Sequence, residues 1–453
     1  MSKQLFSDFS EVSSKQWKQK IQADLKGADY NATLIWHTNE GIDVKPFYHK
    51  DEFDQPLRTS RSKATAFKIC QSIFVANTEK SNVKSLDAIN RGAEAINFII
   101  PSADVSVTEL LKGIDLTSTP VSFTLKFLSL EFLKTIPSHN NLMLDIDIIG
   151  HLAKTGNWYH NLNEDHKLFE SIVNQTNTFT VHSSLYQNAG ANMVQQLAYS
   201  LAHLNEYFNH FEMILSDTQK QTTQIIFNVS VGTNYFFEIA KLKALRILYT
   251  TLANAYNFNN KCHINVTPSR RNKTIYDYNT NMLRTTTECM SAVLGGANWV
   301  TNLAYDAVYH KDNEFGERIS RNQLLILKNE SYFDKVDNPA DGAYYIESLT
   351  TQLSEKALEL FKTIEANGGF LSQLKDGAIQ KKIKENALKE QTQFNTGDHV
   401  LLGTNTYPNP QDKMKDELEL YPFIKHNPVK TLIEPIIEKR LAEALEQERL
   451  KTE

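Results

Sequence analysis

The chain has 453 residues and a net charge of -5, from 48 Lys and Arg against 53 Asp and Glu. This length accommodates one large α/β barrel with appended segments. The slight acidic excess argues against general nucleic-acid binding, which requires a surplus of basic side chains to neutralise phosphates.

The first 65 residues are predicted to form an N-terminal arm. Within it, residues 14–27 have an amphipathic pattern that predicts a helix, with Trp17, Ile21 and Leu25 on one face and Gly27 as its C-cap. Two short segments look extended: 34–36 and 45–48. Such an arm has too little apolar content to fold alone, so we expect it to pack on the barrel or on a partner.

Residues 66–396 repeat a short β-rich run followed by a longer helical pattern. Amphipathic helices are predicted between the strands, for example at 85–92, 193–208 and 235–249. Strands that alternate with helices predict a parallel sheet, and eight such units predict a (β/α)8 barrel, a TIM barrel, with a doubly wound open sheet as the alternative. The predicted strands are 67–75, 95–100, 121–127, 141–147, 179–183, 225–229, 263–266 and 299–302.

The C-terminal part of the chain is predicted to be a helical extension. Helices are expected at 346–366 and 372–385, before a polar, proline-containing linker. A charged helix is expected from residue 433, because Glu alternates there with Lys or Arg at helical spacing, which is typical of a solvated face. The linker and charged helix together form a predicted third region, 397–453.

The sequence has no pattern typical of a secreted or membrane-spanning protein. The N-terminus has no apolar signal core, and no apolar run approaches the ~20 residues that a membrane helix needs. Cys70, Cys262 and Cys289 lie far apart and form no CxxC pair, which favours a reducing compartment over a disulfide framework. We therefore expect a cytoplasmic protein that binds neither nucleic acid nor a membrane.

Polar residues at the ends of two predicted strands are candidates for chemistry. Asp145 and Asp147 lie on one face of strand 141–147, where paired carboxylates could act as acid and base or bind a metal. The pattern favours the simpler interpretation, a polar strand end that caps the next helix. His182 lies near the end of strand 179–183 without an acid close in sequence, so we interpret it as a hydrogen-bonded structural histidine.

A basic loop could hold an anion. Arg270, Arg271 and Lys273 follow the strand at 263–266, and three cations there could clamp a phosphorylated ligand such as coenzyme A. Three cations in a loop are equally compatible with a solvated surface, and the sequence leaves both interpretations open.

Two further patterns have simple interpretations. Gly295 and Gly296 belong to neither a GxGxxG nor a P-loop motif, so we interpret them as a tight turn between a helix and a strand. Asp398, His399 and Gly403 superficially match a cobalamin-ligand signature, Asp-x-His-x-x-Gly, but Asp and His are adjacent here. We assign that match no function.

Ordered segments over most of the chain resemble the barrel half of methylmalonyl-CoA mutases. The most specific is 281–297, which begins Asn-Met-Leu-Arg-Thr-Thr and ends Leu-Gly-Gly-Ala. The segment 187–191, Gln-Asn-Ala-Gly-Ala, is similar to the family's loop after strand five. Further segments that resemble the family, in the same order, are 17–27, 40–42, 45–48, 91–95, 197–199, 238–246, 318–322, 338–350 and 364–369.

This sequence differs from the family pattern at several positions where the catalytic chains of the family carry characteristic motifs. Aligning the Ala-Gly-Ala motif places Leu185 where those chains carry the histidine of Gly-Tyr-His-Met-Gln-Glu-Ala-Gly-Ala, which contacts the substrate carbonyl. Residues 48–68 lack the family's Arg-Pro-Trp-Thr-Ile-Arg-Gln motif, and 265–270 differ from its Gln-Thr-Ser-Gly-Trp-Ser. Residues 433–453 supply no Asp-x-His-x-x-Gly loop to ligate cobalt.

The resemblance, with these departures, implies a small, non-catalytic subunit of an adenosylcobalamin-dependent mutase. In such family members a large subunit interconverts methylmalonyl-CoA and succinyl-CoA, a step of propionate metabolism. We therefore expect a heterodimer with that subunit, an arm that wraps it, and adenosylcobalamin bound by the partner. No catalytic, cofactor-binding or metal-binding residue is expected in this chain. The alternatives are a catalytic barrel that uses cobalamin from a separate chain, and a barrel that binds coenzyme A for another function.

Overall fold

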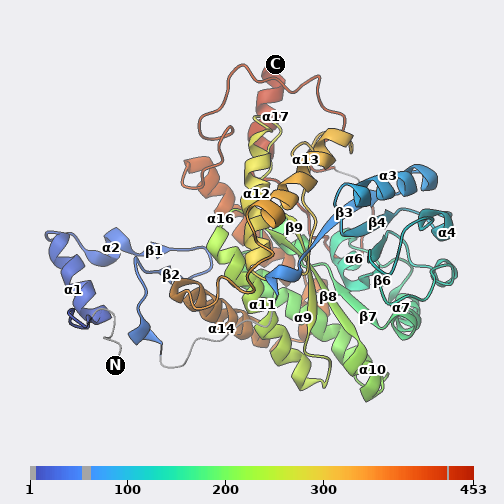
Figure 1. Cartoon of the computed structure of the whole chain (residues 1–453), viewed down its shortest axis with the longest axis horizontal. Helices are drawn as coiled ribbons and strands as arrows, with labels where there is room; N and C mark the ends of the chain where they lie inside the picture. The colour runs from blue at the N-terminus through green and yellow to red at the C-terminus, as the bar shows by residue number, and fades with distance from the viewer. Residues whose placement is uncertain (1–6, 54–62, 426–427) are drawn as a thin grey trace.

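The computed structural model describes residues 7–53, 63–425 and 428–453. Its centre is one sheet of eight parallel strands in the order β6-β5-β4-β3-β10-β9-β8-β7. Figure 1 shows helices around this sheet. These strands are β3 (Lys68–Phe74), β4 (Ala95–Ile100), β5 (Val121–Leu125), β6 (Leu142–Asp145), β7 (Thr178–Val181), β8 (Gln224–Val231), β9 (Cys262–Pro268) and β10 (Trp299–Val300). All eight predicted strands are therefore present.

Strand order decides between the two predicted architectures. Except for β6 and β7, strands that follow one another in sequence are neighbours in the sheet, and β10 pairs with β3, which curls the sheet into a nearly closed barrel. Within this order, β6 and β7 are the two ends and share no backbone pairing. The (β/α)8 barrel is confirmed, and the doubly wound alternative is wrong, because that fold would leave the first strand inside an open sheet.

Helices pack around the barrel because one face of each strand is apolar. Ile96, Phe98 and Ile100 of β4, for example, are fully buried in the core shared with the surrounding helices. The helices between and after the strands are α3 (Thr78–Asn90), α4 (Val107–Leu110), α5 (Leu130–Leu133), α6 (Ile148–Thr155), α7 (Leu162–Thr176), α8 (Ser184–Asn188), α9 (Met193–Phe211), α10 (Asp217–Thr222), α11 (Tyr235–Ala255), α12 (Thr280–Leu294) and α13 (Glu314–Leu325). No helix in the described part of the chain is long and apolar enough to cross a membrane.

Two helix predictions need correction at their ends. The helix predicted at 85–92 begins at Thr78, because the Asn77 side chain accepts the Lys80 N–H and caps it. The helix predicted at 372–385 is two helices, since Gly377 adopts a left-handed conformation with φ +73. The C-terminal helices are α14 (Tyr344–Ala366), α15 (Gly369–Lys375) and α16 (Ala378–Thr396).

The N-terminal arm extends from one side of the barrel (Figure 1). It contains α1 (Ser14–Asp24), α2 (Tyr30–Leu34) and a small hairpin of β1 (Trp36–His37) and β2 (Asp43–Val44). α1 has no buried residue, and its Trp17 stacks on Phe47 within the arm, with 4.2 Å between ring centroids. The hairpin contacts the body of the protein through an edge-on contact of Trp36 with Phe237.

The end of the chain is more ordered than its charge pattern predicts. The last helix, α17, spans Glu443–Thr452 and does not begin at residue 433, because Pro435 lacks an N–H and disfavours helix in the residue before it. Residues 431–442, which we call the C-terminal strap, cross the carboxyl ends of the barrel strands. The strap's Lys439 and Leu441 donate backbone hydrogen bonds to the carbonyls of Asn188 and Arg271.

Candidate functional site

The inside of the barrel is apolar at one end and polar at the other. Near the amino ends of the strands a buried layer fills the axis; it consists of Cys70, Ala95, Met143, Ile226 and Trp299. Above it, neighbouring strands carry hydrogen-bonded polar side chains. Asn97 donates to Ser72 and accepts from Thr124, and Asn265 donates to Asn228. The carboxyl half of the barrel is therefore a polar lumen.

This lumen borders open space. Asn228, Asn265 and Thr267 are partly exposed although helices cover the outside of their strands. The hydroxyl of Thr180 and the side-chain oxygen of Asn265 are buried without a hydrogen-bond partner among the described residues. Unpaired buried polar atoms of this kind normally face water or a ligand, so the carboxyl mouth is the candidate functional site.

The seam between β6 and β7 is closed by side chains. Nε2 of His182 donates to Oδ1 of Asp145 at 2.6 Å, and the hydroxyl of Thr124 donates to the other oxygen at 2.7 Å. Asp147 accepts the backbone N–H of His182 at 2.7 Å. The predicted hydrogen bonding of His182 is confirmed, and its acid partner lies 37 residues away in sequence.

Asp147 is a buried structural carboxylate. It caps α6 by accepting the Gly150 N–H at 2.7 Å, which confirms the predicted capping role. It also accepts hydrogen bonds from His203 at 2.9 Å and Tyr207 at 2.6 Å, both on α9. Asp145 and Asp147 therefore share His182, which uses its ring for Asp145 and its backbone N–H for Asp147, but their other partners differ.

The charges at the seam stabilise one another. Burial alone raises the pKa of Asp145, but the attraction and hydrogen bond of His182 outweigh it and lower the pKa. For His182, burial lowers the pKa, and the attraction of Asp145 and Asp147 outweighs it and raises the pKa. Each member of the pair therefore favours the charged form of the other.

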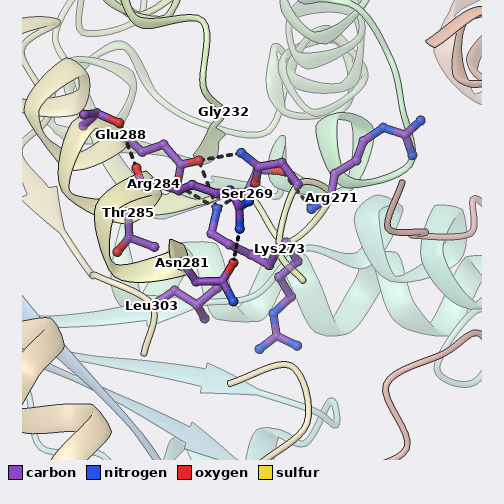
Figure 2. Close-up of polar contacts among 12 residues, drawn as sticks. Gly232, Ser269, Arg271, Lys273, Asn281, Arg284, Thr285, Glu288 and Leu303 are labelled. Carbon is purple, nitrogen blue, oxygen red and sulfur yellow. Dashed lines mark hydrogen bonds and ion pairs between the residues drawn. The ribbon is translucent and has the colours of Figure 1, made fainter. Parts of the chain in front are cut away.

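The basic loop after β9 forms no anion clamp. Figure 2 shows this loop meeting α12. Lys273 is buried and paired with Glu288 of α12 at 2.8 Å, and Arg271 is paired with Glu390 of α16 at 2.5 Å. Arg271 also donates to the carbonyl of Lys439 in the strap at 2.8 Å. Two of the three candidate cations are thus neutralised within the protein, whereas Arg270 remains exposed.

A cavity of about 370 Å³ lies beside the mouth, between the arm hairpin and the barrel. Most of its polar groups are satisfied by the protein. Asn39 and Gln393 exchange hydrogen bonds at 2.8 and 3.1 Å, and Gln187 donates to Glu238 and accepts from Lys241, both at 3.0 Å. Groups paired in this way have little capacity left for a ligand.

The two glycine-containing patterns have structural roles. Gly295 and Gly296 form the predicted tight turn between α12 and β10, with φ +85 at Gly296. Gly403 has φ +75, and a Cβ there would lie 2.5 Å from Asp277. Asp398 accepts a hydrogen bond from Thr396, and the His399 N–H donates to the carbonyl of Gln393.

Leu185 belongs to the hydrophobic core. It lies in α8, which begins shortly after His182, and its side chain is 3% exposed. A leucine at this position can neither donate a hydrogen bond nor transfer a proton. The segment that lacks the family's Arg-Pro-Trp-Thr-Ile-Arg-Gln motif, 48–68, includes residues 54–62, which lie outside the described residues.

Sequence reasoning missed one functional candidate, Lys126. It directly follows β5, its side chain is exposed, and it lies two residues after Thr124, whose hydroxyl donates to Asp145 at the seam. A charged residue at the end of a buried strand is a signal that could have identified it. The link between Asp145 and His182 could not be seen in the sequence, because barrel closure creates it.

The described residues do not fit a cobalt-ligating loop. Asp398 and His399 are adjacent, and the Asp398 carboxylate is engaged by Thr396 rather than by an imidazole. Within the described ranges, no group of three or more His, Cys, Asp or Glu side chains could hold a metal ion.

Comparison with known proteins identifies the family. The sequence model of methylmalonyl-CoA mutase matches residues 101–448. The methylmalonyl-CoA mutase small subunit of Porphyromonas gingivalis is 32% identical, over 99% of this chain and 78% of that protein. The methylmalonyl-CoA mutases of Rhizobium meliloti and Bos taurus (mitochondrial) are each 26% identical; the alignments cover 91% and 89% of this chain but 66% and 62% of those proteins.

One solved structure, a methanol:cobalamin methyltransferase complex from Methanosarcina barkeri, aligns over 79% of this chain and 88% of that chain. Its TM-score of 0.28 and identity of 9% are too low to bear on fold or function. The extent of the family match and the identity to the small subunit are sufficient by themselves: the chain belongs to the methylmalonyl-CoA mutase family.

Proposed function

We propose that this chain is the small, non-catalytic subunit of an adenosylcobalamin-dependent methylmalonyl-CoA mutase in the cytoplasm. Its role is to stabilise a catalytic large subunit that interconverts methylmalonyl-CoA and succinyl-CoA. The observation that carries this proposal is the burial of Leu185 in the hydrophobic core. The resemblance to catalytic chains puts a substrate-contacting histidine at this position, and leucine cannot take over its role.

The C-terminal strap supports the same proposal. Catalytic groups of barrel enzymes lie at the carboxyl ends of the strands. Here the strap binds the loops after β7 and β9 through Asn188 and Arg271, so part of that end is occupied by the chain itself. The buried residues Ile433, Ile436 and Leu441 anchor it.

The exposed arm supports a heterodimer. α1 buries no residue against the rest of the chain, and Val12, Trp17 and Trp36 are exposed. Large apolar side chains on an extended segment are typical of obligate interfaces, which are large and apolar. In this proposal the arm, residues 1–65, wraps the large subunit, whereas 66–396 form the barrel and 397–453 the linker and strap.

The proposal assigns adenosylcobalamin to the large subunit. When bound, this cofactor supplies the radical chemistry of the rearrangement, and the protein must enclose it away from water. The described residues of this chain do not fit cobalt ligation, so no step of the rearrangement is assigned to them.

Co-expression separates the proposal from its two alternatives. The chain is purified alone and together with a full-length mutase large subunit from the same genome, and isomerisation of methylmalonyl-CoA is assayed with adenosylcobalamin. We expect no turnover by this chain alone, and a stable heterodimer whose large subunit is active. Turnover by this chain with only a separate cobalamin-domain protein would instead establish a catalytic barrel. Tight binding of coenzyme A by the isolated chain would support a coenzyme A-binding barrel.

A further inference from the structure

The N-terminal arm contains a cavity of its own, of about 450 Å³, between α1, α2 and the β1–β2 hairpin. Figure 1 shows these elements projecting from one side of the barrel. The stack of Trp17 on Phe47 holds α1 against the chain that follows the hairpin, and Phe47 also lines the cavity. Lys15 and Lys18, three residues apart on one face of α1, line it as well. The cavity belongs to the arm alone, because every residue that lines it lies between 14 and 52.

The wall of this arm cavity has more positive than negative charge. Three lysines and two carboxylates line it, which leaves a net charge of +1 with His37 neutral. Both carboxylates already have partners in the wall. Asp43 pairs with His37 at 2.7 Å, and Glu52 pairs with Lys45 at 2.6 Å. The two lysines of α1 carry the excess, and within the described ranges neither makes a side-chain hydrogen bond or an ion pair.

Neighbouring carboxylates do not neutralise these two lysines. The carboxylates on either side of them in sequence, Glu11 and Asp24, pair with other lysines, Lys50 and Lys20. The ammonium group of Lys18 lies 4.6 Å from the centroid of the Tyr30 ring, a contact that leaves its positive charge in place. Like charges on one helix face repel each other, so the empty cavity attracts an anion.

The surroundings of the cavity favour an anionic group of a protein over a free ion. α1 buries no residue. Val12, two residues before the lining residue Ser14, is 55% exposed, and Trp36, between two lining residues, is 50% exposed. Exposed apolar side chains of this size mark protein–protein contacts. A carboxylate flanked by apolar residues uses both the lysines and these side chains, whereas a free anion gains nothing from Val12 and Trp36.

We propose that the arm cavity receives an aspartate or glutamate side chain of the large subunit, whose carboxylate binds the ammonium groups of Lys15 and Lys18. This inference rests on the proposed function, because it requires a large subunit. Hydrogen bonds between an ammonium group and a carboxylate are short and about twice as strong as those between neutral groups. The Asn31 amide also lines the cavity and supplies a further donor. Such a directional contact fixes the register of the arm on its partner, which apolar contacts alone do not.

Zero-length cross-linking of the co-purified wild-type complex identifies the occupant. A carbodiimide activates a carboxylate, and a lysine in contact with it forms an amide as the activating group leaves as a urea. Mass spectrometry should find Lys15 or Lys18 joined to an aspartate or glutamate of the large subunit. Lys20, on the same helix but outside the cavity, should be joined to Asp24 instead. Links of Lys15 and Lys18 only to a second copy of this chain, or no link in a complex that has formed, overturn the proposal.

The affinity of the full chain for the large subunit provides a second test. Lys15→Gln and Lys18→Gln should each weaken binding by about threefold, and the double variant by about tenfold, at low potassium chloride. The differences should shrink at high potassium chloride, because salt screens partly exposed charges. Lys20→Gln, the control on the same helix, should bind as wild type does. All variants should unfold at the wild-type temperature, since α1 buries no residue.

The outcomes of this second test separate the arm cavity from the subunit role. If the wild-type chain binds the large subunit and the double variant binds equally well at both salt concentrations, the cavity proposal is overturned and the subunit role stands. If the wild-type chain binds no large subunit, both are overturned.

Titration with malonate and inorganic phosphate distinguishes a protein carboxylate from a small anion. We expect weak binding of either anion to the isolated full chain and none to the assembled heterodimer, because the partner's carboxylate then fills the cavity. Saturable binding that persists in the heterodimer and is lost in the double variant of Lys15 and Lys18 would assign the cavity to a small anion. That result would overturn the proposal.

Discussion

His182 and Asp145 join the two strand ends of the barrel that backbone pairing leaves apart. The 2.6 Å bond from Nε2 of His182 to Oδ1 of Asp145 spans the ends of β7 and β6, the outer strands of the eight-stranded order. A second bond, from the His182 N–H to Asp147, reinforces the same seam at 2.7 Å. Side-chain hydrogen bonds therefore complete a closure that the β-ladder does not.

We expect this pair to make stability depend on pH. The pKa of His182 is raised above its ordinary 6.5, so its contribution is full below pH 6.5 and is lost as the pH rises through the folded-state pKa. The pKa of Asp145 is lowered below its ordinary 3.8, so its contribution is full above pH 3.8 and is lost as the pH falls through the folded-state pKa. The pair therefore contributes most between these two values.

Urea unfolding of wild type, His182→Gln, Asp145→Asn and the double variant measures this contribution. Each single variant should lose about 1–3 kcal/mol at pH 6, with a coupling energy in the double-mutant cycle, because each leaves one charged partner unpaired. At pH 9 the loss in His182→Gln should shrink. A loss independent of pH, or strict additivity, would contradict the seam pair.

Asp147→Ala should destabilise the protein more than Asp145→Asn. Its carboxylate accepts four hydrogen bonds, from Gly150, His182, His203 and Tyr207. Removal leaves these donors unpaired in the interior, which should cost about 3–5 kcal/mol in unfolding free energy. The comparison variant Tyr207→Phe removes one donor to Asp147 and the acceptor of the Ile149 N–H, and should cost about 2 kcal/mol. Equal losses in urea unfolding would show that Asp147 serves only Tyr207.

Leu185→His should destabilise the chain. The side chain packs in the core with 3% exposure, so a histidine there would be buried without a prepared partner, at about 2 kcal/mol or more. Leu185→Met keeps the volume and should cost less than about 1.5 kcal/mol. Thermal and urea unfolding report the difference. Unchanged stability of Leu185→His would mean that this position can still accommodate the histidine of catalytic relatives.

We expect one buried ion pair to hold the C-terminal strap in place. Glu446 of α17 is fully buried, bonds the Ile275 N–H at 2.9 Å and pairs with Arg440 of the strap at 2.7 Å. Glu446→Gln should cost about 3 kcal/mol and increase hydrogen exchange across 431–442, because Arg440 then lacks a counter-charge. The exposed Glu448→Gln, on the same helix, should change stability by less than about 0.5 kcal/mol. If hydrogen exchange across 431–442 were unchanged in Glu446→Gln, the pair of Glu446 and Arg440 would not anchor the strap.

Gly190 is required by both backbone conformation and space. Its φ is +99, and a Cβ would lie 2.6 Å from the Cβ of Ala387 and 2.9 Å from the guanidinium carbon of Arg271. Gly377 also has positive φ, +73, but no atom within 4 Å of a Cβ. Gly377→Ala should cost about 1–2 kcal/mol, and Gly190→Ala roughly 1–3 kcal/mol more. If Gly190→Ala and Gly377→Ala lowered the free energy of unfolding equally in urea, the contact between Gly190 and α16 would be able to accommodate a methyl group.

The sequence alone predicted the barrel because its strands carry a local signal. Ile96, Phe98 and Ile100 alternate with lumen-facing residues in a segment predicted with the observed bounds. Helix ends were less predictable. The polar start of α3, at Thr78, has no apolar face to reveal it, and only the Asn77 cap sets its beginning.

Predictions from charged residues were the least accurate, because the sequence shows where a charged residue lies but not which residue it pairs with. Arg271 and Lys273 suggested an anion clamp, yet Arg271 pairs with Glu390 on α16 and Lys273 pairs with Glu288 on α12. The alternating charges after residue 433 suggested a solvated helix, whereas Glu443 and Glu446 are buried.

What the sequence by itself determined is the set of strands, the alternation with helices and, through ordered similar segments, the family. These properties depend on residues close together in the chain. Only the tertiary structure decided that Asp145 meets His182, that Lys273 pairs with Glu288, and that the strap covers part of the mouth. The physical reason is barrel closure, which brings the carboxyl ends of strands distant in sequence to one rim and there determines which charges are paired and which remain free.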